Sequence, residues 1–125
     1  IELAIVDTVT DTISADSTSG DINLIHTAPA AAEITVTSLT TGIGNIDFDQ
    51  TLDADLIVEK STTTDGDITI ENTGDTSDDI ISVLSSGITA GGDGSVTLTT
   101  NTAGNIDIDA TVTALGDRVT LDSAR

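Results

Sequence analysis

The side chains that could carry out catalysis are few in this sequence. It contains one histidine, His26, no cysteine, and three basic residues, Lys60, Arg118 and Arg125. No Gly-x-Ser-x-Gly motif accompanies the histidine, and the strand-like residues before it, Ile22–Leu24, place it at an edge or a turn. The scattered basic residues leave no base for the polysaccharide cleavage that some solenoid enzymes perform. We therefore expect no enzymatic activity and an exposed His26.

Carboxylates offer a second kind of chemistry, the binding of a metal ion. Asp47 and Asp49 alternate with apolar residues, so both are expected on the outer face of one strand, and Asp107 and Asp109 repeat this arrangement. Carboxylates stacked at the spacing of neighbouring strands repel, and Ca²⁺, a hard cation with oxygen ligands, would relieve that repulsion. EF-hand spacing is absent, and the GGDGS segment from Gly91 is not repeated in tandem. The four aspartates are candidate Ca²⁺ ligands, with a solvated acidic face as the alternative, and no cofactor is required.

Thr-x-Thr pairs suggest a third kind of surface, because flat threonine ladders occur on ice-binding solenoids. Their uneven spacing argues against one aligned face, and threonine is in any case favoured on the outer side of strands. An ice-binding solenoid is kept as an alternative. Carbohydrate stacking is disfavoured because the chain has no Trp or Tyr. The pairs are Thr8/Thr10, Thr35/Thr37, Thr97/Thr99 and Thr111/Thr113.

The charge balance argues against further partners. The chain carries 22 Asp and Glu residues against 3 Lys and Arg residues, a formal net charge of −19 at pH 7. Such a surface repels the phosphates of nucleic acids and of anionic membranes. No stretch approaches the roughly 20 apolar residues that a membrane-spanning helix needs. Neither nucleic-acid binding nor membrane insertion is expected.

The elements that must position these side chains are short β-strands. Apolar residues recur in pairs at i and i+2, which puts both on one face of a strand, and residues that favour helices are scarce. Several strands follow a glycine plus a polar residue, and glycine permits the positive φ of a sharp corner. These steps begin at Gly20, Gly44, Gly66 and Gly104. The apolar pairs are Ile22/Leu24, Ile34/Val36, Ile46/Phe48, Ile68/Ile70, Val96/Leu98, Ile106/Ile108 and Val119/Leu121.

The spacing of the corners predicts a solenoid. The first three glycines are 24 and 22 residues apart, with another strand near the middle of each interval. About 22 residues suit one rung of a three-sided parallel β-solenoid, with two longer strands, a shorter one and a narrow aliphatic core. The alternative is an antiparallel β-sandwich, whose strands also recur about ten residues apart but which usually has several core aromatics. This chain has a single aromatic residue, Phe48.

A second similarity, over a longer interval, is superimposed on the short repeat. GNIDFD from Gly44 returns as GNIDID from Gly104, 60 residues later, and EITVTS from Glu33 resembles SVTLTT from Ser95, 62 residues later. We expect an array of coils that diverge in blocks. Residues 1–125 are thus interpreted as a single β-repeat segment, an excerpt of a longer array, because the sequence begins without Met and ends in mid-pattern.

Segments such as GSVTLTTNTAGNIDIDATVTALGDRVTLDSA, from Gly94 to Ala124, resemble the degenerate β-strand repeats of filamentous-haemagglutinin-like and autotransporter-type bacterial adhesins. The resemblance covers nearly the whole chain and is weakest over residues 77–92. It implies an all-β, right-handed parallel β-solenoid (β-helix) on or outside a bacterial cell surface, and it carries over no catalytic residue.

The expected function is that of a non-catalytic structural segment of a secreted or cell-surface fibre or adhesin. Its expected partners are neighbouring repeats, or identical subunits stacked end to end into filaments, because the end rungs of a solenoid present open strand edges. The alternatives are a discrete β-sandwich binding module from a tandem array and the ice-binding solenoid named above.

Overall fold

The computed structural model describes residues 12–27, 33–51, 53–74, 79–100 and 103–123. These residues form eleven β-strands and no helix, as the abundance of β-branched residues predicts. The strands are β1 (Thr12–Ser17), β2 (Ile22–His26), β3 (Glu33–Ile43), β4 (Ile46–Gln50), β5 (Asp55–Asp65), β6 (Ile68–Asn72), β7 (Ile80–Ala90), β8 (Val96–Thr100), β9 (Asn105–Ile108), β10 (Val112–Ala114) and β11 (Val119–Ser123).

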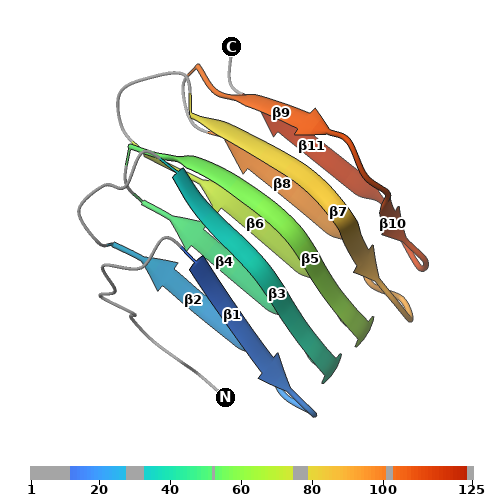
Figure 1. Ribbon diagram of the computed structural model, residues 1–125. Helices are drawn as coiled ribbons and strands as arrows, with labels where there is room; N and C mark the ends of the chain where they lie inside the picture. The colour runs from blue at the N-terminus through green and yellow to red at the C-terminus, as the bar shows by residue number, and fades with distance from the viewer. Residues whose placement is uncertain (1–11, 28–32, 52, 75–78, 101–102, 124–125) are drawn as a thin grey trace.

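The strands form two parallel sheets that wind into a solenoid of about four turns (Figure 1). One sheet has the order β1-β3-β5-β7-β10, with β9 also paired to β7, and the other has the order β11-β8-β6-β4-β2. The chain passes from one sheet to the other and back, advancing one strand per turn with a right-handed sense (Figure 1). Every pairing between the described strands is parallel, so the predicted solenoid is confirmed and the antiparallel sandwich is wrong.

The rungs are slightly longer than the spacing of the first glycines indicated. Stacked residues on the short strands are separated by 24, 22, 28 and 23 residues, so a rung averages about 24 rather than 22. The variation comes from the loops and from β7, whose path is longer than that of β5 between their paired residues. The stacked residues are Ile22, Ile46, Ile68, Val96 and Val119.

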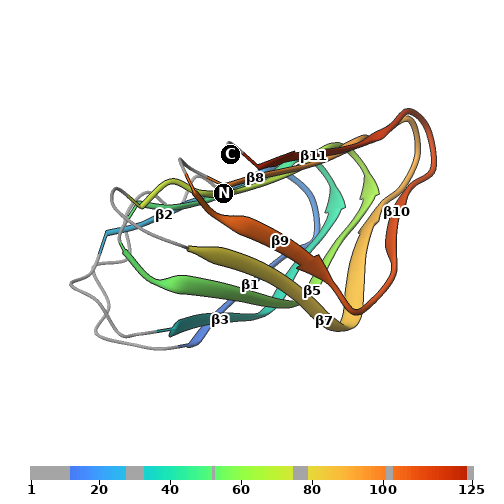
Figure 2. The same cartoon turned by 90° about the horizontal axis from the view of Figure 1, so that it is seen from above.

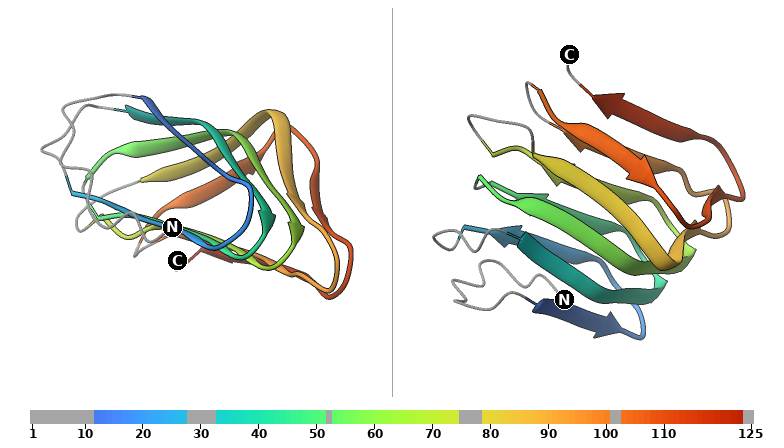
Figure 3. Two further views of the ribbon diagram at one scale, coloured as in Figure 1. Left: turned by 90° about the horizontal axis from the view of Figure 1, so that it is seen from below. Right: turned by 45° about the horizontal axis from the view of Figure 1, so that its top comes forward.

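Each rung has three sides, but the strands divide them differently from the prediction. A continuous eleven-residue strand supplies two sides, and a five-residue strand supplies the third. In β3 the buried positions run Ile34, Val36 and then Leu39, Thr41, so the inward phase shifts by one residue where the strand bends. The views along the solenoid show this bend as a wedge-shaped cross-section (Figures 2 and 3). In the last turn the same path is split into β9 and β10.

The core is the narrow aliphatic column that the sequence predicts. Inward side chains of each short strand lie directly over those of the next, at the strand spacing of about 4.8 Å. Full burial of one such side chain stabilises the fold by roughly 1.5–3 kcal/mol. Phe48, the one aromatic residue, is fully buried between Leu24 and Ile70. Leu98 continues that column.

One corner of every complete rung is built on glycine, and we call it the glycine corner. Gly20, Gly44 and Gly66 have φ values of 106°, 139° and 148° there, which confirms the predicted positive φ. A Cβ on Gly66 would lie 2.2 Å from the Gly44 carbonyl oxygen, so stacking also demands glycine. Inward threonines complete the corner, because Thr63 Oγ1 donates to the same Gly44 oxygen at 2.8 Å.

The fourth predicted corner is not equivalent to the other three. Gly104 is not among the glycines with positive φ, and it lies at the opposite edge of the rung, which we call the loop end, where short strands pass into long ones. GNIDFD accordingly forms β4 in the short-strand sheet, whereas GNIDID forms β9 in the long-strand sheet. The two similar segments therefore do not occupy equivalent positions, because their separation of 60 residues corresponds to about two and a half rungs.

Candidate functional site

Two of the four candidate metal ligands lie together on the outside of the short-strand sheet. Asp47 and Asp49 project outward from β4, and Glu71 on β6 is the register neighbour of Asp49. Burial, and then the charge of Asp49, raises the pKa of Asp47. Burial, followed by the charges of Asp49 and Asp47, raises the pKa of Glu71. We call Asp47, Asp49 and Glu71 the outer cluster, a set of carboxylates that repel one another. The hydroxyl of Thr73, whose Oγ1 donates to Asp49 Oδ1 at 2.8 Å, compensates this repulsion only a little.

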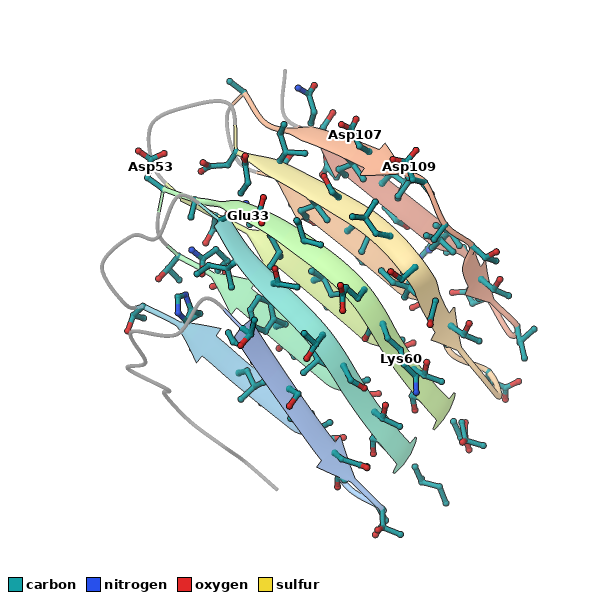
Figure 4. The ribbon with its side chains drawn as sticks, viewed as in Figure 1. Glu33, Asp53, Lys60, Asp107 and Asp109 are labelled. Atoms are coloured by element: carbon teal, nitrogen blue, oxygen red, sulfur yellow. The ribbon has the colours of Figure 1, made fainter. Side chains whose placement is uncertain are left out.

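The other two candidate ligands lie on the other sheet. Asp107 on β9 is the register neighbour of Ser82, and Asp109 follows the end of the strand (Figure 4). Both are exposed, and the fold does not bring them to Asp47 and Asp49. Within the described ranges, no group of three or more His, Cys, Asp or Glu side chains is arranged to hold a metal ion. Calcium binding by these four residues remains a prediction for experiment.

A ladder of side chain to backbone hydrogen bonds runs up the glycine corner. Asp21 Oδ1 accepts from the Asn45 amide at 2.7 Å, and Asn45 Oδ1 accepts from the Asp67 amide at 2.9 Å. Asp67 Oδ1 accepts from both the amide and the hydroxyl of Ser95 at 2.8 Å, which lowers the pKa of Asp67. The sequence showed a polar residue after each corner glycine but not this role, which joins each rung to the next.

The single histidine is in the core, so the prediction of an exposed His26 is wrong. Only 2% of its surface is exposed. Its Nδ1 is 2.5 Å from Gln50 Oε1, and because an amide oxygen can only accept, Nδ1 donates. The inward alternation of Ile22 and Leu24 simply continues to His26. Above it, Gln50, Asn72 and Thr100 occupy the same inward position in successive rungs, so the loop end contains a buried polar column.

The last turn differs from the others because its inward side chains are exposed. Val119 and Leu121 stack on Val96 and Leu98, yet they are 41% and 51% exposed, whereas the residues beneath them are fully buried. Ile108, which stacks on Val83, is 38% exposed. We call these three residues and their strands the open end coil. It presents an apolar surface bordered by strand edges, which can accept a further parallel coil.

A column of threonines follows the second half of the long strands. One half-buried threonine stands in register on each of four neighbouring strands, although their separations along the chain are uneven. Of the predicted Thr-x-Thr pairs, only Thr111/Thr113 contributes to this column, through Thr113. Thr35/Thr37 and Thr97/Thr99 lie on different sheets, and Thr8/Thr10 lie outside the described residues. The threonines of the column are Thr40, Thr62, Thr89 and Thr113.

Comparisons of the chain with protein-family models, with curated proteins and with solved structures found no match. The described part of the chain has no helix long and apolar enough to cross a membrane. A proposal for function therefore depends on the geometry of the solenoid itself.

Proposed function

We propose that this chain is a non-catalytic structural segment of a secreted or cell-surface bacterial fibre or adhesin. In this role the solenoid provides reach and stiffness, and the open end coil is covered by a neighbouring repeat or by an identical subunit stacked end to end. The single observation that carries the proposal is the exposure of Ile108, Val119 and Leu121 at positions that are fully buried one rung below.

A further coil would bury the apolar side chains that the open end coil leaves exposed. Each inner rung has its backbone paired above and below, and its inward side chains are sealed by those of its neighbours. The open end coil keeps the same strand direction and the same inward columns, so a further coil would meet aligned apolar side chains. Removing them from water stabilises the contact by about 25 cal/mol per Å² of apolar surface. The net charge of −19 opposes the approach of a second copy, and salt reduces this repulsion.

The oligomeric state of the chain tests this proposal. Sedimentation at rising protein concentration and salt should show association of the parent chain, driven by the open end coil. Leu121→Lys, which puts a charge on the apolar end surface, should abolish association. Thr120→Lys is the matched control, because Thr120 lies on the same strand facing outward, and it should associate like the parent. A chain that stays monomeric under all these conditions, or equal association of both variants, contradicts end-to-end stacking.

Ice binding is a second candidate, and the in-register threonine column favours it. Four threonines repeat at the strand spacing along the outer face of one sheet, which the uneven spacing in the sequence concealed. Inhibition of ice recrystallisation measures this activity. Thr62→Lys together with Thr89→Lys should remove it, while Thr69→Lys on the other sheet should not. No inhibition by the parent chain rejects this candidate.

A further inference from the structure

The two ends of the solenoid differ in how much apolar surface they expose. Among the described strands, β2 and β11 lie at opposite edges of one sheet (Figure 1). Ile22 and Leu24 on β2 are each only 4% exposed, whereas Val119 and Leu121 on β11 are 41% and 51% exposed. If the open end coil stacked on the first turn of another copy, it would find almost no exposed apolar column there. The complementary surface is the open end coil of a second copy.

The open end coil is complementary to itself under a two-fold axis. Two identical surfaces in a closed dimer are related by such an axis, and the two β11 strands then run antiparallel. Pairing along the whole strand, Val119–Ser123, requires the axis to pass at its middle residue, Leu121. Residues directly opposite each other in an antiparallel pair share one face. The two Leu121 side chains therefore meet on the inward side, where each is about half exposed in the single chain.

The charges on the outer face of β11 fit the same axis. Arg118 directly precedes the strand and is 76% exposed, and its contact with Asp117 is a long one, 3.9 Å. With Leu121 on the axis, Thr120 lies opposite Asp122 of the second copy. Arg118 is then the diagonal neighbour of that Asp122 on the outer face, a separation of about 7–8 Å that long side chains span. The axis creates this pair twice, so two ion pairs form across the contact.

We propose that two copies of this chain form a closed dimer through their open end coils, with the two β11 strands antiparallel and centred on Leu121. The proposal rests on the end-to-end stacking proposed above and names the surface that covers the open end coil. It also sets the size of the assembly. Because the first turn exposes almost none of its inward apolar side chains, both outer ends of the dimer are closed to further copies.

Sedimentation equilibrium separates this dimer from open-ended stacking. As the protein concentration and the salt concentration rise, the parent chain should reach the mass of a dimer and then stay at that mass. Continued growth into longer species would overturn the closed dimer but would still support end-to-end stacking. A chain that is monomeric under every condition would overturn both proposals.

A single introduced cysteine reports the two-fold axis directly, because the chain has no cysteine of its own. Leu121→Cys should give a disulfide-linked dimer under mild oxidation, since the axis places this residue beside its own copy. Thr69→Cys, on the outer face of β6, is the matched control and should remain unlinked. Linkage of Leu121→Cys no faster than that of Thr69→Cys would overturn the proposal.

Charge reversal tests the predicted contact between Arg118 and Asp122. Arg118→Glu and Asp122→Arg should each weaken dimerisation at low salt by about threefold to tenfold, and the double variant should restore the affinity of the parent. The two residues lie about 13 Å apart along one strand, so restoration requires the second copy. Asp122→Arg also makes the chain less negative, and reduced general repulsion alone would strengthen association. A double variant no tighter than Arg118→Glu would therefore overturn the pairing centred on Leu121.

Discussion

The middle rungs and the open end coil use the same inward pattern with opposite results. Val96 and Leu98 on β8 are fully buried, while Val119 and Leu121, one rung above them in the same columns, are about half exposed. The sequence pattern of the two strands is the same, so the difference comes from the neighbours. In a solenoid, the stability of a coil is set mainly by the coils on either side of it.

Two truncations in the same inward column, one in a middle rung and one in the open end coil, should give the largest difference in unfolding free energy. Leu98→Ala removes a fully buried side chain and should cost about 2–5 kcal/mol of unfolding free energy. Leu121→Ala, in the same column, should cost less than about 1 kcal/mol, because its side chain is already 51% exposed. Denaturant unfolding measures both. Equal losses would mean that the end coil is as well packed as the middle.

The glycine corner should show the same contrast. Gly66→Ala introduces a Cβ 2.2 Å from the Gly44 carbonyl oxygen at a φ of 148°, and should destabilise by about 2–3 kcal/mol. Asp117 occupies the corresponding corner of the last turn, and Asp117→Ala removes only an exposed ion pair with Arg118, worth about 0–1 kcal/mol. A Gly66→Ala chain as stable as the parent would contradict the stacked corner.

Acid should weaken the ladder at the glycine corner. Hydrogen bonds from Ser95 hold the pKa of Asp67 below its usual value, so the stability that it contributes is present above the unfolded pKa and is lost as the pH falls through the folded value. Asp67→Asn should therefore reduce stability at neutral pH and flatten its loss in acid. Unfolding free energies measured from about pH 7 to about pH 3 give the slope. An unchanged slope would show that Asp67 contributes no such linkage.

The outer cluster should give a smaller effect of opposite sign. The pKa of Asp47 is raised by burial and by Asp49, so its charged form is disfavoured by folding, and stability should increase as the pH falls through the raised value. Asp47→Asn should stabilise the chain at neutral pH by about 0.2–0.5 kcal/mol, and added NaCl should shrink this gain. Asp122→Asn, on the outer face of the end coil, should change little. A destabilised Asp47→Asn would indicate that this carboxylate is satisfied by a bound cation.

Much of the architecture could be predicted from the sequence because one rule, an inward pair at i and i+2, holds in nearly every strand. The glycine corners were found because positive φ and close stacking both require glycine at positions such as Gly44 and Gly66. The continuous long strand was not predicted, since the change of phase between Val36 and Leu39 interrupts the alternation where the strand bends.

The buried polar residues at the loop end could not be predicted from the sequence, for a different reason. His26 and Asn72 extend an apolar alternation at its last position, and a polar residue there looks like the start of a turn until the next rung is seen to cover it. The two Asp pairs looked equivalent because their segments are nearly identical. They lie about two and a half rungs apart, however, and therefore fall on different sheets. Register between rungs, which loop length determines, could not be deduced from strand patterns alone.

Hydrogen exchange of the backbone amides tests most directly the claim that neighbouring coils, and not the strand sequence, provide stability and leave the end coil open for assembly. In dilute solution at low salt, we expect amides of β4, β6 and β8 to be strongly protected and those of β9, β10 and β11 to exchange much faster. At high concentration and salt, the end coil should gain protection while the middle rungs change little. Protection of the end coil equal to that of the middle under dilute conditions would contradict the account.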